Sequence, residues 1–180
     1  MINKTILFVL GILLFTGCRK QEQELLSEME NDAFKGVEKS LNPFLEDMEL
    51  GVKTSYTTGN ITLSTGSWTF NNALIGTSTS DKKNGTKSAR ITSTGKLTLL
   101  TDKANGAGTV TVKHAAYGTD ASSTWQLWYS TNTGASYTQV GGTITSVSGN
   151  LATATFTVNV AGNIRFEVRK ITGTTTRINI

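Results

Sequence analysis

Histidine, cysteine and catalytic motifs are scarce in this 180-residue chain, and their scarcity excludes several enzyme classes. The chain has one histidine, His114, and one cysteine, Cys18. It contains no histidine-rich metal set, no Gly-x-Ser-x-Gly nucleophile elbow and no glycine-rich phosphate loop. A single cysteine also leaves no partner for an internal disulfide. A folded domain must therefore gain its stability from its hydrophobic core.

Acidic side chains are also few in the C-terminal part of the chain. Residues 51–180 contain four of them: Asp81, Asp102, Asp120 and Glu167. A glycoside hydrolase needs two carboxylates placed across one bond, whereas the three aspartates lie in polar turn sequences where Asp commonly caps backbone amides. His114 is in register with Val110 and Val112, so we expect it to face the core in a structural role. We therefore predict that the chain is not an enzyme and needs no cofactor.

The net charge of +4 hides a strong asymmetry. Residues 19–50 carry nine acids and four bases, a net charge of −5, whereas residues 51–180 carry twelve bases and four acids, a net charge of +8. A basic domain is typical of proteins with an anionic partner, such as nucleic acid, an acidic polysaccharide or lipopolysaccharide. Because the bases are spread along the chain, a solvated cationic surface without a specific ligand is the alternative interpretation.

The apolar run at the N-terminus is too short to cross a bilayer as a stable helix. Residues 6–15 are apolar, residues 16–17 are small, and Cys18 follows. This order resembles a bacterial lipoprotein signal peptide, although Phe15 stands where that family usually has Leu. The resemblance implies removal of residues 1–17 and lipidation of Cys18. An outer-membrane location is favoured because Arg19 is not the Asp that retains lipoproteins at the inner membrane. An ordinary secretory signal with an incidental cysteine is the alternative.

Residues 18–43 are expected to form an acidic, partly helical tether between the lipid anchor and the domain. Its apolar residues recur every three or four positions, as in an amphipathic helix: Leu26, Met29, Ala33, Val37 and Leu41. Gly36 interrupts this pattern, and the only proline, Pro43, ends it. The acids of the segment loosely resemble the signals that direct some lipoproteins to the outer cell surface.

Residues 44–180 have the composition and periodicity of β-strands. Threonine supplies 29 of the 130 residues from 51 to 180, and β-branched residues favour strands. Apolar and polar side chains alternate clearly in residues 109–113, 154–160 and 164–169. Turn signals rich in Asn and Gly lie at 84–85, 105–106, 132–134 and 149–150. Short alternating strands without amphipathic helices among them predict an all-β, antiparallel β-sandwich.

The sequence Trp-Gln-Leu-Trp-Tyr at 125–129 carries the most distinctive aromatic pattern. It places Trp125 and Leu127 on one face of a strand and Trp128 on the other. We assign Trp125 and Leu127 to the core. Trp128 is then a candidate platform on which a sugar ring or a base stacks. The alternative is that a loop covers Trp128.

Further candidate ligand-binding residues are aromatic or basic. Tyr117 and Tyr137 lie near predicted turns and are candidates to extend the Trp128 surface. Lys113, Arg165 and Arg169 alternate with apolar residues and point away from the core. If their strands are neighbours, these three form a basic stripe, but the sequence does not give the strand order.

Several runs spread over residues 45–180 together resemble one known domain. They are residues 48–56, 66–70, 73–76, 81–85, 88–91, 114–120, 123–130, 164–170 and 177–180. This set is similar to the jelly-roll accessory domain that lies beside the catalytic domain in secreted DNA/RNA non-specific endonucleases of Gram-negative bacteria. The resemblance implies a jelly-roll β-sandwich that targets or presents a substrate. The nuclease residues themselves are absent, so nuclease activity is not implied.

Two further expectations follow from the resemblance. In that family the final strand usually continues into one more short strand, whereas this sequence ends at Ile180, so we expect a short last strand with an exposed edge. Jelly-roll sandwiches often hold one structural Ca²⁺, for which Glu46, Asp47 and Glu49 are candidate ligands. No calcium loop with regular Asp spacing accompanies them.

Three functions are compatible with these observations. The first is a lipid-anchored, non-catalytic binding module that recognises a polysaccharide or nucleic acid. The second is a truncated relic or accessory part of a secreted endonuclease. The third is a structural or adhesive surface lipoprotein, for which the threonine-rich strand faces are sufficient.

Overall fold

The computed structural model describes residues 44–180, which form nine β-strands. The expected signal peptide, the lipidation site Cys18 and the tether over 18–43 lie outside the described residues. The strands are β1 (Gly59–Leu63), β2 (Gly66–Gly76), β3 (Ser88–Leu99), β4 (Ala107–Ala116), β5 (Ser123–Ser130), β6 (Thr138–Ser146), β7 (Ala152–Val160), β8 (Arg165–Lys170) and β9 (Arg177–Asn179). Within residues 44–180, no helix is long and apolar enough to cross a bilayer.

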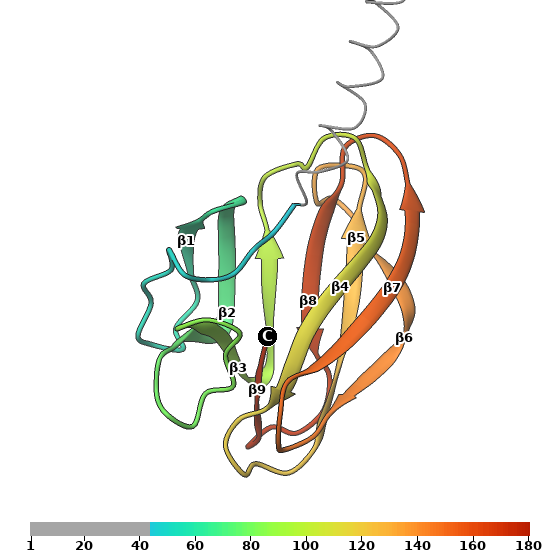
Figure 1. The fold of residues 1–180 in the computed structure, drawn as a ribbon. Coiled ribbons are helices and arrows are strands. Elements are labelled where there is room, and N and C mark those ends of the chain that lie inside the picture. Colours follow the sequence, from blue (N-terminus) through green and yellow to red (C-terminus); the bar gives the residue numbers. More distant parts are fainter. Residues whose placement is uncertain (1–43) are drawn as a thin grey trace, which may run out of the picture. The chain divides into compact units, whose positions relative to one another are not determined.

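The strands form two layers that share β2 and β3 (Figure 1). Along the same edge, β3 pairs with β8 through residues 96–98 and with β9 through residues 90–92. One layer is therefore β1-β2-β3-β8-β5-β6, and the other continues from β3 through β9 and β4 to β7. The layers separate beside residues 93–95, where Ser93 has a positive φ of 50°. All pairings between the strands are antiparallel. The predicted fold class, an all-β jelly-roll sandwich, is confirmed.

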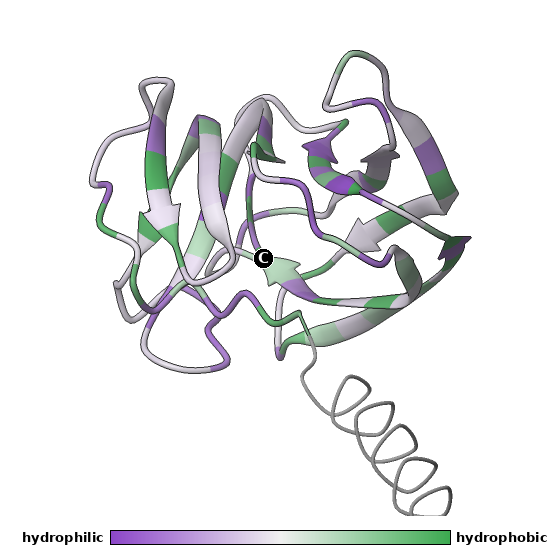
Figure 2. Ribbon diagram, turned by 90° about the horizontal axis from the view of Figure 1, so that it is seen from above, coloured by the Kyte–Doolittle hydropathy of each residue, from purple (hydrophilic) through white to green (hydrophobic). Residues whose placement is uncertain are grey.

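The hydrophobic core lies between the two layers. Hydrophobic and hydrophilic residues alternate along several strands, as expected from the sequence (Figure 2). Trp125 of β5 is fully buried and contacts Phe156 of β7 edge to face, with 5.7 Å between ring centroids. Leu127, on the same face of β5 as Trp125, is also buried. The assignment of Trp125 and Leu127 to the core is therefore confirmed. Large aromatic side chains from facing sheets supply much of the apolar surface that such a sandwich buries.

The short last strand is not an exposed edge, so that expectation was wrong. β9 lies between β3 and β4 and pairs with both. Ile180 extends the pairing, because it exchanges two backbone hydrogen bonds of 2.9 Å with Ala89. Both sides of this strand are occupied by its neighbours, which leaves no unpaired edge for another chain to extend.

A bulge in β6 depends on one of two adjacent glycines. Between the pairs Trp125–Ile144 and Leu127–Val140, β6 has extra residues, and Gly141 adopts φ +58°. A Cβ at Gly141 would lie 3.4 Å from Cδ1 of Phe156, whereas a Cβ at Gly142 would meet nothing within 4 Å. Gly141, and not Gly142, is therefore the residue whose left-handed conformation the bulge requires.

We predict that Gly141→Ala lowers the free energy of unfolding by about 1–2 kcal/mol, the cost of a left-handed conformation for a residue with a Cβ. The neighbouring Gly142→Ala is the matched control and should change it by less than about 0.5 kcal/mol. Urea unfolding of both variants measures the difference. Equal stabilities for the two variants would show that the bulge does not hold Gly141 in this conformation.

Candidate functional site

Polar side chains on the outer face of the β1-β2-β3-β8-β5-β6 layer form two rows that run across the strands. Members of each row lie opposite one another on neighbouring strands. The first row consists of Asn71, Lys96, Arg169 and Gln126. The second row consists of Asn60, Thr69, Thr98, Glu167, Trp128 and Gln139. At about 4.8 Å between strands, the second row extends about 24 Å across six strands.

Hydroxyl and amide groups supply most of the hydrogen-bonding capacity of these rows. Asn71 donates to Oγ1 of Thr58 at 2.8 Å, Thr69 donates to Oδ1 of Asn60 at 2.7 Å, and Gln126 donates to Oγ1 of Thr143 at 2.8 Å. Such groups can both donate and accept hydrogen bonds. The outer face is therefore suited to a ligand rich in hydroxyl groups.

Trp128 lies on β5, between Glu167 and Gln139 in the second row, and is half-buried. Its indole Nε1 donates to Oε1 of Gln126 at 3.1 Å. The guanidinium carbon of Arg169 lies 4.0 Å from the ring centroid, within the range of a cation–π interaction. Arg169 thus covers part of the Trp128 ring. The sequence left open that a loop would cover this ring, whereas the covering group is a side chain of the neighbouring strand β8.

Glu167 is the buried carboxylate at the centre of this face. It lies on the outward side of β8, yet its side chain is only 1% exposed, because Lys96, Arg169 and Thr98 surround it. Lys96 Nζ is 3.1 Å from Oε2, and Arg169 donates to Oε1 through Nε. Burial would raise the pKa of Glu167, but the hydrogen bonds from Thr98, Arg169 and Lys96 outweigh it and hold the pKa below its usual value.

Two other sequence candidates lie close to Arg169. The Tyr137 ring centroid is 5.6 Å from the Arg169 guanidinium carbon. Arg165 lies on the same face of β8 as Arg169 and forms an ion pair with Asp102. Burial raises the pKa of the Tyr137 hydroxyl, and the charge of Glu167 adds to that effect. The structure therefore brings Trp128, Tyr137, Arg165 and Arg169 together.

Lys113 does not belong to this group. It is exposed on β4, opposite Thr153 of β7, and β4 does not pair with β8. The basic stripe considered from the sequence is therefore limited to Arg165 and Arg169 on β8. Strand order alone decides this point, and the sequence could not provide it.

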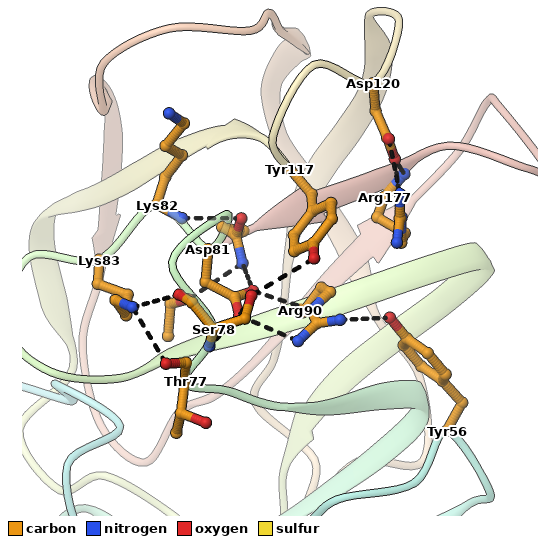
Figure 3. A network of polar contacts seen from close by, with 12 residues as sticks. Tyr56, Thr77, Ser78, Asp81, Lys82, Lys83, Arg90, Tyr117, Asp120 and Arg177 are labelled. Atoms are coloured by element: carbon orange, nitrogen blue, oxygen red, sulfur yellow. Dashed lines mark hydrogen bonds and ion pairs between the residues drawn. The ribbon is translucent and has the colours of Figure 1, made fainter.

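Tyr117 belongs to a separate polar network at the end of β4 (Figure 3). Its ring lies 4.5 Å from the guanidinium carbon of Arg90 and 4.0 Å from that of Arg177. Both arginines form two-bond pairs with aspartates: Arg90 with Asp81, and Arg177 with Asp120. Asp120 also accepts a hydrogen bond from the backbone of Arg177. This network ties the loops before β3 and after β4 to the last strand.

The structural roles predicted for the aspartates and for His114 agree with their contacts. Asp81 accepts from the backbone N–H of Ser78, as expected for an aspartate in a turn. His114 is buried, its Nδ1 lies 2.9 Å from Oγ of Ser146, and its ring lies 5.2 Å from that of Trp125. Burial lowers the pKa of His114. All four acids of residues 51–180 form ion pairs with arginines.

The candidate calcium ligands bind protein donors. Glu46 accepts from the backbone of Met48 and from the backbone and hydroxyl of Thr65. The Asp47 carboxylate accepts a hydrogen bond from the backbone N–H of Glu49. The Glu49 carboxylate accepts one from the backbone N–H of Thr86. In the part of the chain that the structure describes, no three His, Cys, Asp or Glu residues are grouped so that they could hold a metal.

Sequence reasoning did not single out Lys96, Gln126 or Glu167 as members of one site. Glu167 carried a local signal, because it lies between two arginines in the alternation Arg-x-Glu-x-Arg of residues 165–169. Side chains two residues apart share a strand face, so adjacent ion pairs could have been expected there. Lys96 enters the site only through the pairing of β3 with β8, which no local pattern indicates.

No protein-family model matches the chain, and no curated protein matches it. Among solved structures, the CBM22-1 xylan-binding domain from Paenibacillus barcinonensis Xyn10C is similar, with a TM-score of 0.47, 10% identity and coverage of 71% of this chain and 90% of that one. The CBM22-1-CBM22-2 tandem domain of the same protein gives a TM-score of 0.47 and 9% identity. This match covers 73% of this chain and 45% of the tandem domain. TmCBM61 in complex with beta-1,4-galactotriose is also similar, with a TM-score of 0.48 and 10% sequence identity. This match covers 77% of this chain and 93% of TmCBM61.

Proposed function

We propose that this chain is a lipid-anchored, non-catalytic module of the outer membrane that binds a polysaccharide along the outer face of the β1-β2-β3-β8-β5-β6 layer. One observation carries the proposal: two rows of hydrogen-bonding side chains cross the strands, and Trp128 lies in the second row. An extended ligand of many similar units fits a face whose polar groups repeat from strand to strand.

The chemistry of the rows favours carbohydrate. Sugar hydroxyls donate and accept, as do the Asn, Gln and Thr side chains of this face. Aromatic rings contribute apolar area at low cost in conformational entropy, and the polar groups around them fix the orientation of a ligand. Trp128 and Tyr137 supply these rings beside Gln126 and Arg169.

The first experiment is affinity electrophoresis of the full-length protein in detergent through gels that contain neutral or acidic polysaccharides. We expect Trp128→Ala to weaken binding at least tenfold, because it removes the largest aromatic ring of the site. Its melting temperature should fall by less than about 5 °C, since Trp128 is only half-buried. Lys113→Gln, on the other layer, is the control and should bind normally. Unchanged binding by Trp128→Ala would contradict the proposed site.

A nucleic-acid ligand is the second candidate, because residues 51–180 carry a net charge of +8. It corresponds to the substrate-presenting role that the resemblance to endonuclease accessory domains implies. Fluorescence anisotropy of labelled DNA at low and physiological salt separates the two candidates. DNA binding that survives physiological salt, without polysaccharide binding, would replace the first proposal. If neither polymer binds, the structural or adhesive interpretation is favoured.

The membrane anchor is tested independently through Cys18. We expect the wild-type protein to incorporate labelled palmitate in bacterial cells and to fractionate with the outer membrane. Cys18→Ser should lose the label completely, because serine lacks the thiol to which the lipid is attached. A wild-type protein without label would show that Cys18 is incidental to an ordinary secretory signal.

A further inference from the structure

A shallow groove lies on the outer face where β8 ends beside β3. Its volume is about 440 Å³, and it is lined by Thr94, Lys96, Arg169, Lys170 and Ile171. This volume falls within the range of small-molecule sites, roughly 300–1,000 Å³. Lys96 and Arg169 are cross-strand neighbours. The groove therefore places two cations side by side, and one of them, Arg169, contacts the Trp128 ring.

The Arg169 side chain is held in a defined position beside the groove. Its Nε donates to the buried Glu167, and its guanidinium plane lies over Trp128, with Tyr137 further away. The hydrogen bond to Glu167 uses one of five guanidinium N–H donors. A fixed planar guanidinium is suited to a carboxylate, because two parallel N–H···O bonds form at little cost in side-chain entropy.

The charges of this cluster do not balance. Lys96 and Arg169 share one carboxylate, that of Glu167, so the three residues together carry one net positive charge. Glu167 is only 1% exposed, whereas the Lys96 side chain is 45% exposed. A ligand that enters the groove thus meets the cations and not the carboxylate. One bound anion would complete the charge balance.

We propose that the groove binds the carboxylate of an acidic sugar, so that the polysaccharide recognised by this chain contains uronic acid units. The inference rests on the proposed polysaccharide-binding function and names its ligand class. A nucleic acid fits less well, because a run of phosphates needs cations repeated along the ligand, whereas most side chains of the two rows besides Lys96 and Arg169 are neutral amides and hydroxyls.

The test compares two acidic polysaccharides with the uncharged methyl ester of one of them. Full-length protein in detergent is titrated calorimetrically with polygalacturonate, with alginate, and with polygalacturonate whose carboxyl groups are methyl-esterified. We expect an acidic polymer to bind at least tenfold more tightly than the ester. Lys96→Gln should reduce this preference about tenfold. Lys113→Gln removes the same charge on the other layer and should leave the preference unchanged.

The outcomes separate this inference from the function on which it rests. Equal binding of the acid and the ester, abolished by Trp128→Ala, would overturn the acidic-sugar inference and leave the polysaccharide module standing. Failure of all polysaccharides, neutral and acidic, would overturn both. Salt-resistant DNA binding that is lost in Lys96→Gln would assign the groove to a phosphodiester and overturn the inference as well. Circular dichroism of Lys96→Gln checks that the variant is folded.

Discussion

Lys170→Met is expected to lower the free energy of unfolding by about 3 kcal/mol, although it replaces a buried charge with an apolar side chain of similar length. Lys170 is the last residue of β8 and is only 1% exposed. It lies where β8 and β9 diverge along β3, so its Nζ reaches backbone groups of β3 and of the connection between β8 and β9. The lysine thus links β3 to the β8–β9 connection at the point where the two layers separate.

The expected loss follows from the acceptors around the ammonium group. Lys170 Nζ donates to the carbonyls of Ser93 at 2.9 Å, Thr172 at 2.6 Å and Gly173. Gly173 also accepts from Oγ1 of Thr176 at 3.2 Å, so methionine would leave mainly the other two carbonyls without this donor. A hydrogen bond to a charged group contributes about 1.5–3 kcal/mol, and the bonds to Ser93 and Thr172 are only partly buried, so we expect their combined loss to lie near the lower limit for two such bonds, about 3 kcal/mol. Burial lowers the pKa of Lys170, so removal of its charge recovers part of that loss.

Urea unfolding followed by tryptophan fluorescence measures this effect. Lys113→Met is the matched control, since Lys113 is exposed on β4, and it should change the stability by less than about 0.5 kcal/mol. If Lys170→Met were as stable as the wild type, the three carbonyls would not depend on the ammonium group. Lys170 would then have no role in joining the layers.

The fold class was predictable because its signals are local. Alternation in residues 154–160 places Ala154 and Phe156 in the core and Thr155 and Thr157 outside, as the structure shows. The Asn105-Gly106 turn likewise has both residues at positive φ, as expected for Asn-Gly in a tight turn, although the strands that it connects, β3 and β4, do not pair with each other. Periodicity and turn chemistry act over a few residues, so a single sequence displays them directly.

The candidate site was only partly predictable, because it is built by strand order. The outward orientation of Trp128 followed from the burial of Trp125 and Leu127, but its contact with Arg169 depends on the pairing of β5 with β8. The same limit explains why Lys113 was grouped with Arg165 and Arg169. The order of strands in a jelly roll is set by contacts between residues far apart in the chain. Local patterns do not report such contacts.

Asp81→Asn is expected to cost about 3–5 kcal/mol at neutral pH, the usual range when one partner of a buried ion pair is removed. Asp81 is buried, and its two oxygens accept five hydrogen bonds. Oδ1 accepts from Arg90 Nε and from Asn179, and Oδ2 accepts from Arg90 Nη2 and from the backbone and hydroxyl of Ser78. An amide NH₂ in either position would face donors, so rotation of the asparagine side chain cannot restore the network (Figure 3).

The loss of stability caused by Asp81→Asn should depend on pH, and this dependence shows whether the charge of Asp81 is its cause. Burial would raise the pKa of Asp81, but hydrogen bonds from Ser78, Asn179 and Arg90 outweigh it and lower the pKa below the ordinary value of 3.8. The ionised carboxylate therefore stabilises the fold fully above about pH 4, and this contribution disappears as the pH falls through the folded-state pKa.

Urea unfolding from pH 7 to pH 2 tests this dependence. The gap in unfolding free energy between wild type and Asp81→Asn should narrow in acid. Asp47→Asn, at an exposed aspartate, should show a small gap throughout. A gap for Asp81→Asn that stays constant down to pH 2 would mean that shape, and not the charge of Asp81, accounts for its effect.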